Sequence, residues 1–326
     1  MVPDDNRRMT TTTTTKGALE GAVRLGDWGL IRAQGADAAS FLHGQLTNDI
    51  AHLGADEARL AGYCSAKGRL LASFLVWRSA DEILLACSAD LLAPTLKRLR
   101  MFVLRAKCTL SDASAEVPLH GLAGPAAVQW LGAAAPAAVG RTSRLDGATI
   151  VRLPDAAGVP RFLRAGGVSP PPLPELDAQA WRWLEVLGGV ARIEAATTEQ
   201  FVPQMVNYEL IGGVDFQKGC YPGKEIVARS QYRGSVKRRS LLFETDGAAR
   251  AGAEVYDADD PSQPAGQVVN AAPRPAATGG AGSVALVEVK LAAATAGRLR
   301  LGTPDGPALR PLRMPYDVPL EAVAAG

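Results

Sequence analysis

The sequence predicts an α+β protein that ends in a small β-barrel. Strand-like and helix-like stretches alternate in the first third of the 326-residue chain. The strands in this part follow one another through connections too short for the crossovers of a parallel sheet, which indicates antiparallel hairpins. Beyond Ser235 the helical patterns give way to short strands separated by Gly and Pro turns, as in small barrels.

The first predicted unit covers residues 18–115 and follows a polar, low-complexity tail at residues 1–17. Apolar residues that recur every second position predict its strands, and apolar residues at helical spacing predict its helices. We expect strands at residues 29–33, 59–64, 70–77, 83–87 and 107–111, and helices at 35–46 and 91–103.

Two further units are predicted after it. In the second, residues 116–236, the Ala-, Gly- and Pro-rich stretch 125–174 indicates a helix and loop region. Asp177 can cap a helix that runs to Leu187 and stops at two glycines. The third unit, residues 237–326, is the predicted β-barrel, with strands at 240–245, 253–257, 267–270, 284–290 and 298–301.

The composition excludes several classes of protein. Hydrophobic residues make up 47% and charged residues 21%, which is typical of a globular chain and not of a disordered or fibrous one. Lysine and arginine number 35 against 33 acidic residues, so a net charge of +2 does not favour general binding to nucleic acid or membranes. With four cysteines, no C-x-x-C pair, no apolar signal segment and no membrane span, we expect a cytoplasmic protein.

The strongest local signal is the segment KGCYPGKE at residues 218–225. Its glycines and proline describe a tight turn that brings Cys220 to the surface just before a predicted helix. The helix N-terminus and the flanking Lys218 and Lys224 would stabilise the thiolate of Cys220 relative to the thiol. The alternative is a packed structural cysteine in a Gly turn. The spacing of the cysteines and histidines predicts no metal site, and no nucleotide-binding motif occurs.

This segment resembles the signature of the YgfZ-type folate-binding proteins, relatives of the T-protein (aminomethyltransferase) of the glycine cleavage system. Further segments follow in the order of that family and extend the resemblance over roughly residues 20–240. They are LGDW (25–28), HGQLTND (43–49), GYCSAKGR (62–69), RAK (105–107), FVPQM (201–205) and YRG (232–234).

The resemblance implies three lobes around a central channel that binds tetrahydrofolate or a one-carbon derivative. It also implies a role in the maturation or repair of iron–sulfur enzymes, including those that thiolate tRNA, with these client enzymes or assembly proteins as partners. Trp28 and Trp181 match tryptophans that the family associates with folate. Lys218 and Cys220 match the basic residue and the thiol of the signature.

The chemistry of these positions agrees in part with the resemblance. Indole rings can stack on the flat rings of a folate, and basic side chains can bind its glutamate carboxylates. Each position also has a structural alternative, because tryptophans usually pack in cores and polar residues often form turns. The candidate folate-binding residues are Trp28, Trp181, Thr47, Asn48, Asp49, Lys67, Arg69, Tyr221, Glu225 and Arg229, and the candidate catalytic residues are Cys220 and Lys218.

Whether the protein is an enzyme stays open at this point. The matching puts Ala93 where the T-protein has an aspartate that assists methylene transfer, and Leu187 where it has a pterin-binding glutamate. A small shift in the matching would bring Asp90 or Glu185 to these positions. Acid–base assistance needs a group within hydrogen-bond reach, so the differences argue against full aminomethyltransferase activity.

We therefore expect a folate-binding protein in which the rings stack on Trp28 and Trp181, with Cys220 nearby. One alternative is a folate-dependent aminomethyl- or methyltransferase. Another is a binding scaffold that presents Tyr221 and a basic run to a partner protein without using folate. That run could contact tRNA directly, although such runs are more often solvated surface. It consists of Arg229, Arg233, Lys237, Arg238 and Arg239.

Overall fold

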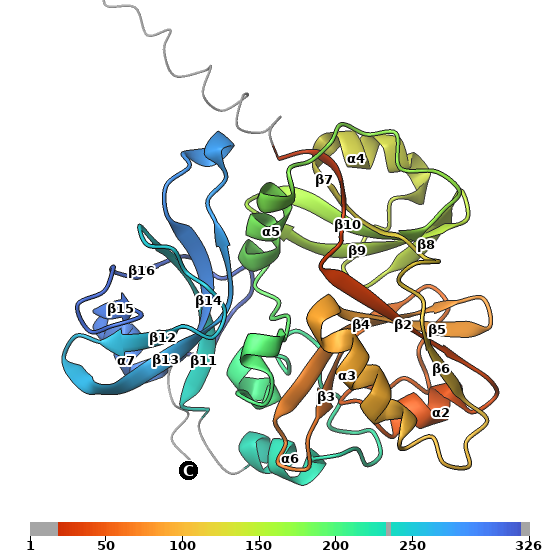
Figure 1. The fold of residues 1–326 in the computed structure, drawn as a ribbon, viewed down its shortest axis with the longest axis horizontal. Helices are drawn as coiled ribbons and strands as arrows, with labels where there is room; N and C mark the ends of the chain where they lie inside the picture. Colours follow the sequence, from red (N-terminus) through yellow and green to blue (C-terminus); the bar gives the residue numbers. More distant parts are fainter. Residues whose placement is uncertain (1–18, 233–235, 321–326) are drawn as a thin grey trace, which may run out of the picture.

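Three antiparallel sheets surround the centre of the molecule, as Figure 1 shows. The structure is a computed structural model, and it describes residues 19–232 and 236–320. The predicted tail at residues 1–17, Arg233 and the last six residues lie outside the described residues. The mixture of helices with antiparallel sheets confirms the predicted α+β class.

The first sheet has the strand order β3-β4-β5-β2-β6 and is antiparallel throughout, as the short connections predicted. The helix α2 is shorter than expected, because Leu46 pairs with Tyr63 instead of continuing the helix. The elements are β2 (Trp28–Gln34), α2 (Ala38–His43), β3 (Ala58–Cys64), β4 (Leu70–Ser79), β5 (Glu82–Ser88), α3 (Ala89–Arg100) and β6 (Thr109–Asp112).

The second sheet, in the order β1-β7-β10-β9-β8, corrects the expectation of a helix and loop region at 125–174. That stretch contains a helix and three strands, and strand residues such as Ile150 and Phe162 are buried. The strand interiors carry strand-forming residues such as Ile150 and Val151, but Ala-, Gly- and Pro-rich segments flank them and dominate the composition of the stretch. The elements are β1 (Gly21–Arg24), β7 (Leu119–Ala123), α4 (Gly124–Leu131), β8 (Thr142–Leu145), β9 (Ala148–Ala156) and β10 (Val159–Gly166).

A connecting region of helices and turns joins the second sheet to the third. Its helix α5 (Ala178–Leu187) begins as predicted, because the Asp177 side chain accepts a hydrogen bond of 2.9 Å from the Ala180 amide. The helix α6 follows the Cys220 segment, also as predicted. The remaining elements are the short 3-10 helices at Gly132–Ala134, Ala195–Thr197, Pro203–Val206 and Ala276–Thr278, and α6 (Lys224–Tyr232).

The third sheet curls into the predicted small barrel. Its order is β15-β12-β13-β14-β11-β16. The segment around Leu309 joins its two edges, because Leu309 donates a backbone hydrogen bond to Leu299 in β15 while the next two residues pair with β11. The elements are β11 (Arg238–Thr245), β12 (Glu254–Asp257), β13 (Asp260–Pro273), β14 (Ser283–Lys290), α7 (Leu291–Ala296), β15 (Leu299–Leu301) and β16 (Arg310–Pro311).

One large apolar core connects the three parts of the molecule. It contains side chains of the first sheet such as Leu85, side chains of the connecting region such as Tyr208, and barrel side chains such as Leu286. Burial of this shared apolar surface holds the lobes together, and they enclose the space described below. No helix among the described residues is long and apolar enough to cross a membrane.

Candidate functional site

The Cys220 segment presents an exposed thiol on an anchored loop. Cys220 is exposed, whereas its neighbours Lys218 and Tyr221 are each only 6% exposed. The Lys218 ammonium group donates hydrogen bonds to the carbonyl oxygens of His43 and Leu46, the latter at 2.7 Å, and lies 4.9 Å from the centre of the Tyr221 ring. Burial, with a contribution from Lys224, lowers the pKa of Lys218 to about 8. Lys218 therefore fastens the loop, and Cys220 projects from it.

Two sequence motifs far apart in the chain meet at a pair of glycines. Gly223 has φ +79° and Gly68 has φ +70°, and the two backbones touch. A Cβ atom on Gly223 would lie 2.5 Å from the Ser65 oxygen and 2.6 Å from the Gly68 Cα. The close approach and the left-handed conformation both require glycine here. The turn at residues 66–68 therefore supports the loop that carries Cys220.

Thr47 and Asn48 are buried and bind the loop at residues 212–213 to the first sheet. The Thr47 hydroxyl donates to the Gly213 oxygen (2.6 Å) and accepts from the Gly62 amide (2.7 Å). The Asn48 amide group donates to the oxygens of Leu60 and Gly212, both at 2.6 Å. Both side chains thus form hydrogen bonds with backbone groups, which agrees with a structural role.

Asp49 joins two histidines beside the Cys220 loop. Its carboxylate lies 2.9 Å from Nδ1 of His43 and 2.8 Å from Nδ1 of His52. Burial opposes ionisation of Asp49, but the hydrogen bonds from His52 and His43 outweigh it and lower the pKa of the carboxyl to about 2. The carboxylate is therefore charged at neutral pH and orients both imidazoles.

A central cavity of about 470 Å³ lies where the three lobes meet. That volume falls within the range of small-molecule sites. Its walls come from the first sheet (Trp28, Leu60), the second sheet and α5 (Arg161, Glu185), and the barrel (Asn270). The lobes of the molecule thus surround a space in which one ligand would contact all three.

Trp28 is oriented in this cavity by two polar neighbours. Its indole Nε1 donates a 2.9 Å hydrogen bond to Oε1 of Glu185, and the guanidinium of Arg192 lies 4.9 Å from the ring centre. Burial raises the pKa of Glu185. Arg192 is held by Asp27 at 2.6 Å, and its Nη1 is buried without a hydrogen-bond partner among the described residues.

The lining of the cavity is rich in arginine. Five arginines and two glutamates line the cavity. Arg161 is fully buried, and this burial lowers its pKa to about 10, so its guanidinium remains charged at neutral pH. Carboxylates just outside the lining pair with four of the arginines, whereas Arg161 forms no ion pair among the described residues. The arginines are Arg59, Arg152, Arg161, Arg182 and Arg192, and the glutamates are Glu185 and Glu194.

The other candidate residues lie outside this cavity. Trp181 is 1% exposed and packs on Gly121 in the core of the second sheet, where a Cβ would lie 2.5 Å from the indole. Cys220 is also outside the lining, so the structure does not bring the thiol and the two tryptophans to one space. Lys67, Glu225 and Arg229 are exposed, and Arg69 donates to the Gln200 oxygen.

The residues matched to the two T-protein carboxylates, and the carboxylates close to them in sequence, lie in different places. Glu185 lines the central cavity, whereas Leu187, two residues further along α5, lines another space. Ala93 is exposed, and the Asp90 carboxylate accepts a 2.9 Å hydrogen bond from the Ala195 amide. Neither residue lines the cavity. Glu185 was considered only through a shift in the T-protein matching, and Arg192, which follows the end of α5, was not a candidate.

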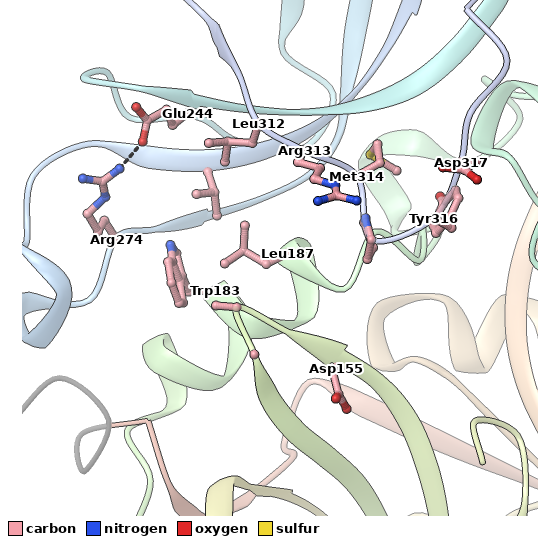
Figure 2. Close-up of a pocket in the computed structure, with 14 residues that line it drawn as sticks. Asp155, Trp183, Leu187, Glu244, Arg274, Leu312, Arg313, Met314, Tyr316 and Asp317 are labelled. Carbon is pink, nitrogen blue, oxygen red and sulfur yellow. Dashed lines mark hydrogen bonds and ion pairs between the residues drawn. The ribbon is translucent and has the colours of Figure 1, made fainter. Parts of the chain in front are cut away.

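A second cavity, of about 560 Å³, lies between α5 and the barrel. Figure 2 shows Trp183 and Leu187 on one side and the ion pair of Glu244 with Arg274 on the other. Pro315 and Tyr316 line both cavities, so the C-terminal segment separates them. Trp28 and Glu185 line the central cavity alone, whereas Trp183 and Leu187 on the same helix as Glu185 line the second cavity close by.

The basic run at residues 229–239 does not form a single exposed surface. Arg238 forms an ion pair with Glu288, and Arg239 is buried against Glu209. Both arginines therefore stabilise the barrel and its contact with the connecting region. Arg233 lies outside the described residues.

Comparisons with known proteins agree with this geometry. No protein-family model matches the chain. It is 32% identical over 231 residues to the tRNA-modifying protein YgfZ of Sodalis glossinidius, covering 66% of this chain and 69% of the relative. It is also 32% identical over 254 residues to YgfZ of Edwardsiella ictaluri, with 70% and 72% covered. A third relative, YgfZ of Escherichia coli, is 30% identical over 240 residues, again with 70% and 72% covered.

The fold has a solved counterpart. The structure of glycine cleavage system aminomethyltransferase T from Bartonella henselae matches 94% of this chain and 89% of its own, with a TM-score of 0.69 and 18% sequence identity. This likeness establishes the fold, and the identities above establish the family. The resemblance seen in the sequence is thereby confirmed: the chain belongs to the YgfZ family.

Proposed function

We propose that the protein binds tetrahydrofolate or a one-carbon derivative in the central cavity and serves in tRNA modification. The names of its relatives, which describe tRNA-modifying proteins, support the second part. The single observation that carries the first part is the arrangement of Trp28, Glu185 and Arg192 in a cavity shared by all three lobes.

The lining fits the chemistry of a folate. The face of Trp28 offers a stacking surface, and stacking contributes roughly 0.5–1.5 kcal/mol beyond the burial of area. The side chain of Glu185 carries a carboxyl group, which can accept hydrogen bonds from N–H groups of the folate rings. The arginines of the lining suit the carboxylates of a glutamate tail. When bound, the folate supplies a carrier for a one-carbon unit.

We propose a separate task for Cys220. The thiol is exposed on a loop fixed by Lys218, and it is outside the cavity lining. An exposed thiol near two lysines is suited to meet a group presented by another protein. In this proposal the protein assists the maturation or repair of iron–sulfur enzymes, among them enzymes that thiolate tRNA, and Cys220 faces the client enzyme while the folate lies in the cavity.

Anaerobic titration with tetrahydrofolate, followed by tryptophan fluorescence, tests the binding site. We expect saturable quenching by the native chain, and affinity about tenfold weaker in Trp28→Leu because its stacking surface is lost. Trp183→Phe, which changes the second cavity, and Cys220→Ser should bind as the native chain does. No saturation at millimolar ligand would refute the folate site, and unchanged affinity in Trp28→Leu would remove Trp28 from it.

A further inference from the structure

The exposed apolar side chains of this protein are concentrated at the end of α3. Of the eight large apolar side chains exposed in the described residues, three lie within four positions: Met101 is 60%, Phe102 is 42% and Leu104 is 88% exposed. Single exposed apolar residues are ordinary, but adjacent ones usually mark a contact surface. We call residues 97–107 the α3 patch.

The same patch concentrates free positive charge. Lys97, Arg98, Arg105 and Lys107 are exposed, and none forms an ion pair within the described residues. By contrast, eleven arginines elsewhere in the described chain are paired with carboxylates. No acidic residue occurs between residues 97 and 107. The patch is therefore an apolar centre surrounded by unneutralised cations.

The α3 patch is held in place by hydrogen bonds to neighbouring segments. Arg100 donates two hydrogen bonds to the Leu110 oxygen, at 3.0 and 2.7 Å, and the Lys107 amide donates to the Asp37 carboxylate at 2.7 Å. Leu104 has φ +31°, a conformation that non-glycine residues rarely adopt. A surface that is ordered in advance loses less entropy when a partner binds.

The patch is linked to the loop of Cys220 through two residues. Arg98 lies beside Tyr63, Tyr63 pairs with Leu46, and the Leu46 oxygen accepts the 2.7 Å hydrogen bond from Lys218. The patch and the loop that carries the thiol are thus connected through the end of β3.

We propose that the α3 patch docks an acidic protein, the iron–sulfur client enzyme of the proposed function on which this inference rests. Met, Phe and Arg side chains are enriched at the centres of protein interfaces, and the free cations require an acidic surface opposite them. RNA would use the cations, but its phosphates offer nothing to the exposed Leu104 and Met101. The combination therefore favours a protein.

Binding of the full chain to a purified iron–sulfur enzyme that thiolates tRNA tests this proposal at low and high salt. Met101→Ser/Leu104→Ser should weaken binding at least about tenfold at both salt concentrations. Arg105→Glu/Lys107→Glu should weaken it by a similar factor at low salt and less at high salt, because salt screens exposed charges. The matched controls are Val168→Ser, a 98% exposed apolar residue, and Arg250→Glu, both outside the patch.

The outcomes separate the two proposals. If the native chain binds the enzyme and both patch variants bind equally well, the docking surface is refuted and the proposed function stands. If the native chain does not bind, the client role in the proposed function fails together with the docking surface. Total tRNA and anionic lipid vesicles serve as further probes. If the patch variants lose binding to tRNA or to the vesicles but keep their binding to the enzyme, the patch belongs to that other ligand and the proposal is overturned.

Discussion

The contact between Gly223 and the turn at Gly68 offers a quantitative test of how the Cys220 loop is positioned. The change is Gly223→Ala, and Gly302→Ala is its matched control. Gly302 has φ +78°, nearly the same as the +79° of Gly223, but an added Cβ at Gly302 meets nothing within 4 Å. The two variants therefore share the cost of the backbone conformation, and only Gly223→Ala adds a steric clash.

The expected loss of unfolding free energy is the sum of the cost of the backbone conformation and the cost of the clash. A left-handed conformation costs a non-glycine residue about 1–2 kcal/mol, which is the expected loss of unfolding free energy for Gly302→Ala. Overpacking typically costs a further ~1–3 kcal/mol. Because the new Cβ of Gly223→Ala would lie 2.5 Å from a backbone oxygen and 2.6 Å from the Gly68 Cα, flexible side chains cannot relieve the clash. The expected loss for Gly223→Ala is about 2–5 kcal/mol.

Urea unfolding measures both losses, and alkylation of Cys220, followed by mass spectrometry of its peptide, measures the loop. We expect Gly223→Ala to change the alkylation rate of Cys220 and Gly302→Ala to leave it unchanged. Equal stabilities of the two variants, with equal alkylation rates, would show that the two turns do not support one another.

Two other substitutions test the electrostatics. Glu209→Ala should lower the unfolding free energy by about 3–5 kcal/mol in urea unfolding, because Arg239 would remain buried without its carboxylate; a loss below 1 kcal/mol would mean that water replaces the pair. In Asp49→Asn the loss should depend on pH. The carboxyl has a pKa of about 2 in the fold and 3.8 in an unperturbed aspartate, so its stabilisation is complete above pH 3.8 and disappears as the pH falls through 2. A difference from the native chain that stays constant across that interval would contradict the assignment.

The sequence predicted those parts of the fold whose signals are local. Strands β3, β4 and β5 follow from alternating apolar residues and short turns, and α5 follows from the cap at Asp177. Strands β8, β9 and β10 carry residues such as Ile150, Val151 and Phe162, but the Ala-, Gly- and Pro-rich segments on either side dominate the composition of residues 125–174, and the strands were missed.

The site was predicted only in part, for a similar reason. The motif around Cys220 is continuous in sequence, so its exposed turn and following helix were foreseen. The cavity combines residues from three lobes. Trp28 was identified directly, Glu185, 157 positions away, only as an alternative in the T-protein matching, and Arg192 not at all. Trp181 shows the limit most clearly, because a helical tryptophan looks the same in sequence whether it packs in a core or faces a ligand.

Hydrogen exchange of the native chain with and without tetrahydrofolate tests the central claim, that the ligand lies in the cavity and the thiol lies apart from it. We expect the ligand to slow exchange in residues 185–194, which line the cavity, and to leave residues 218–222 unchanged. Slower exchange at residues 218–222 without an effect at 185–194 would place the ligand at the Cys220 loop and contradict the proposal.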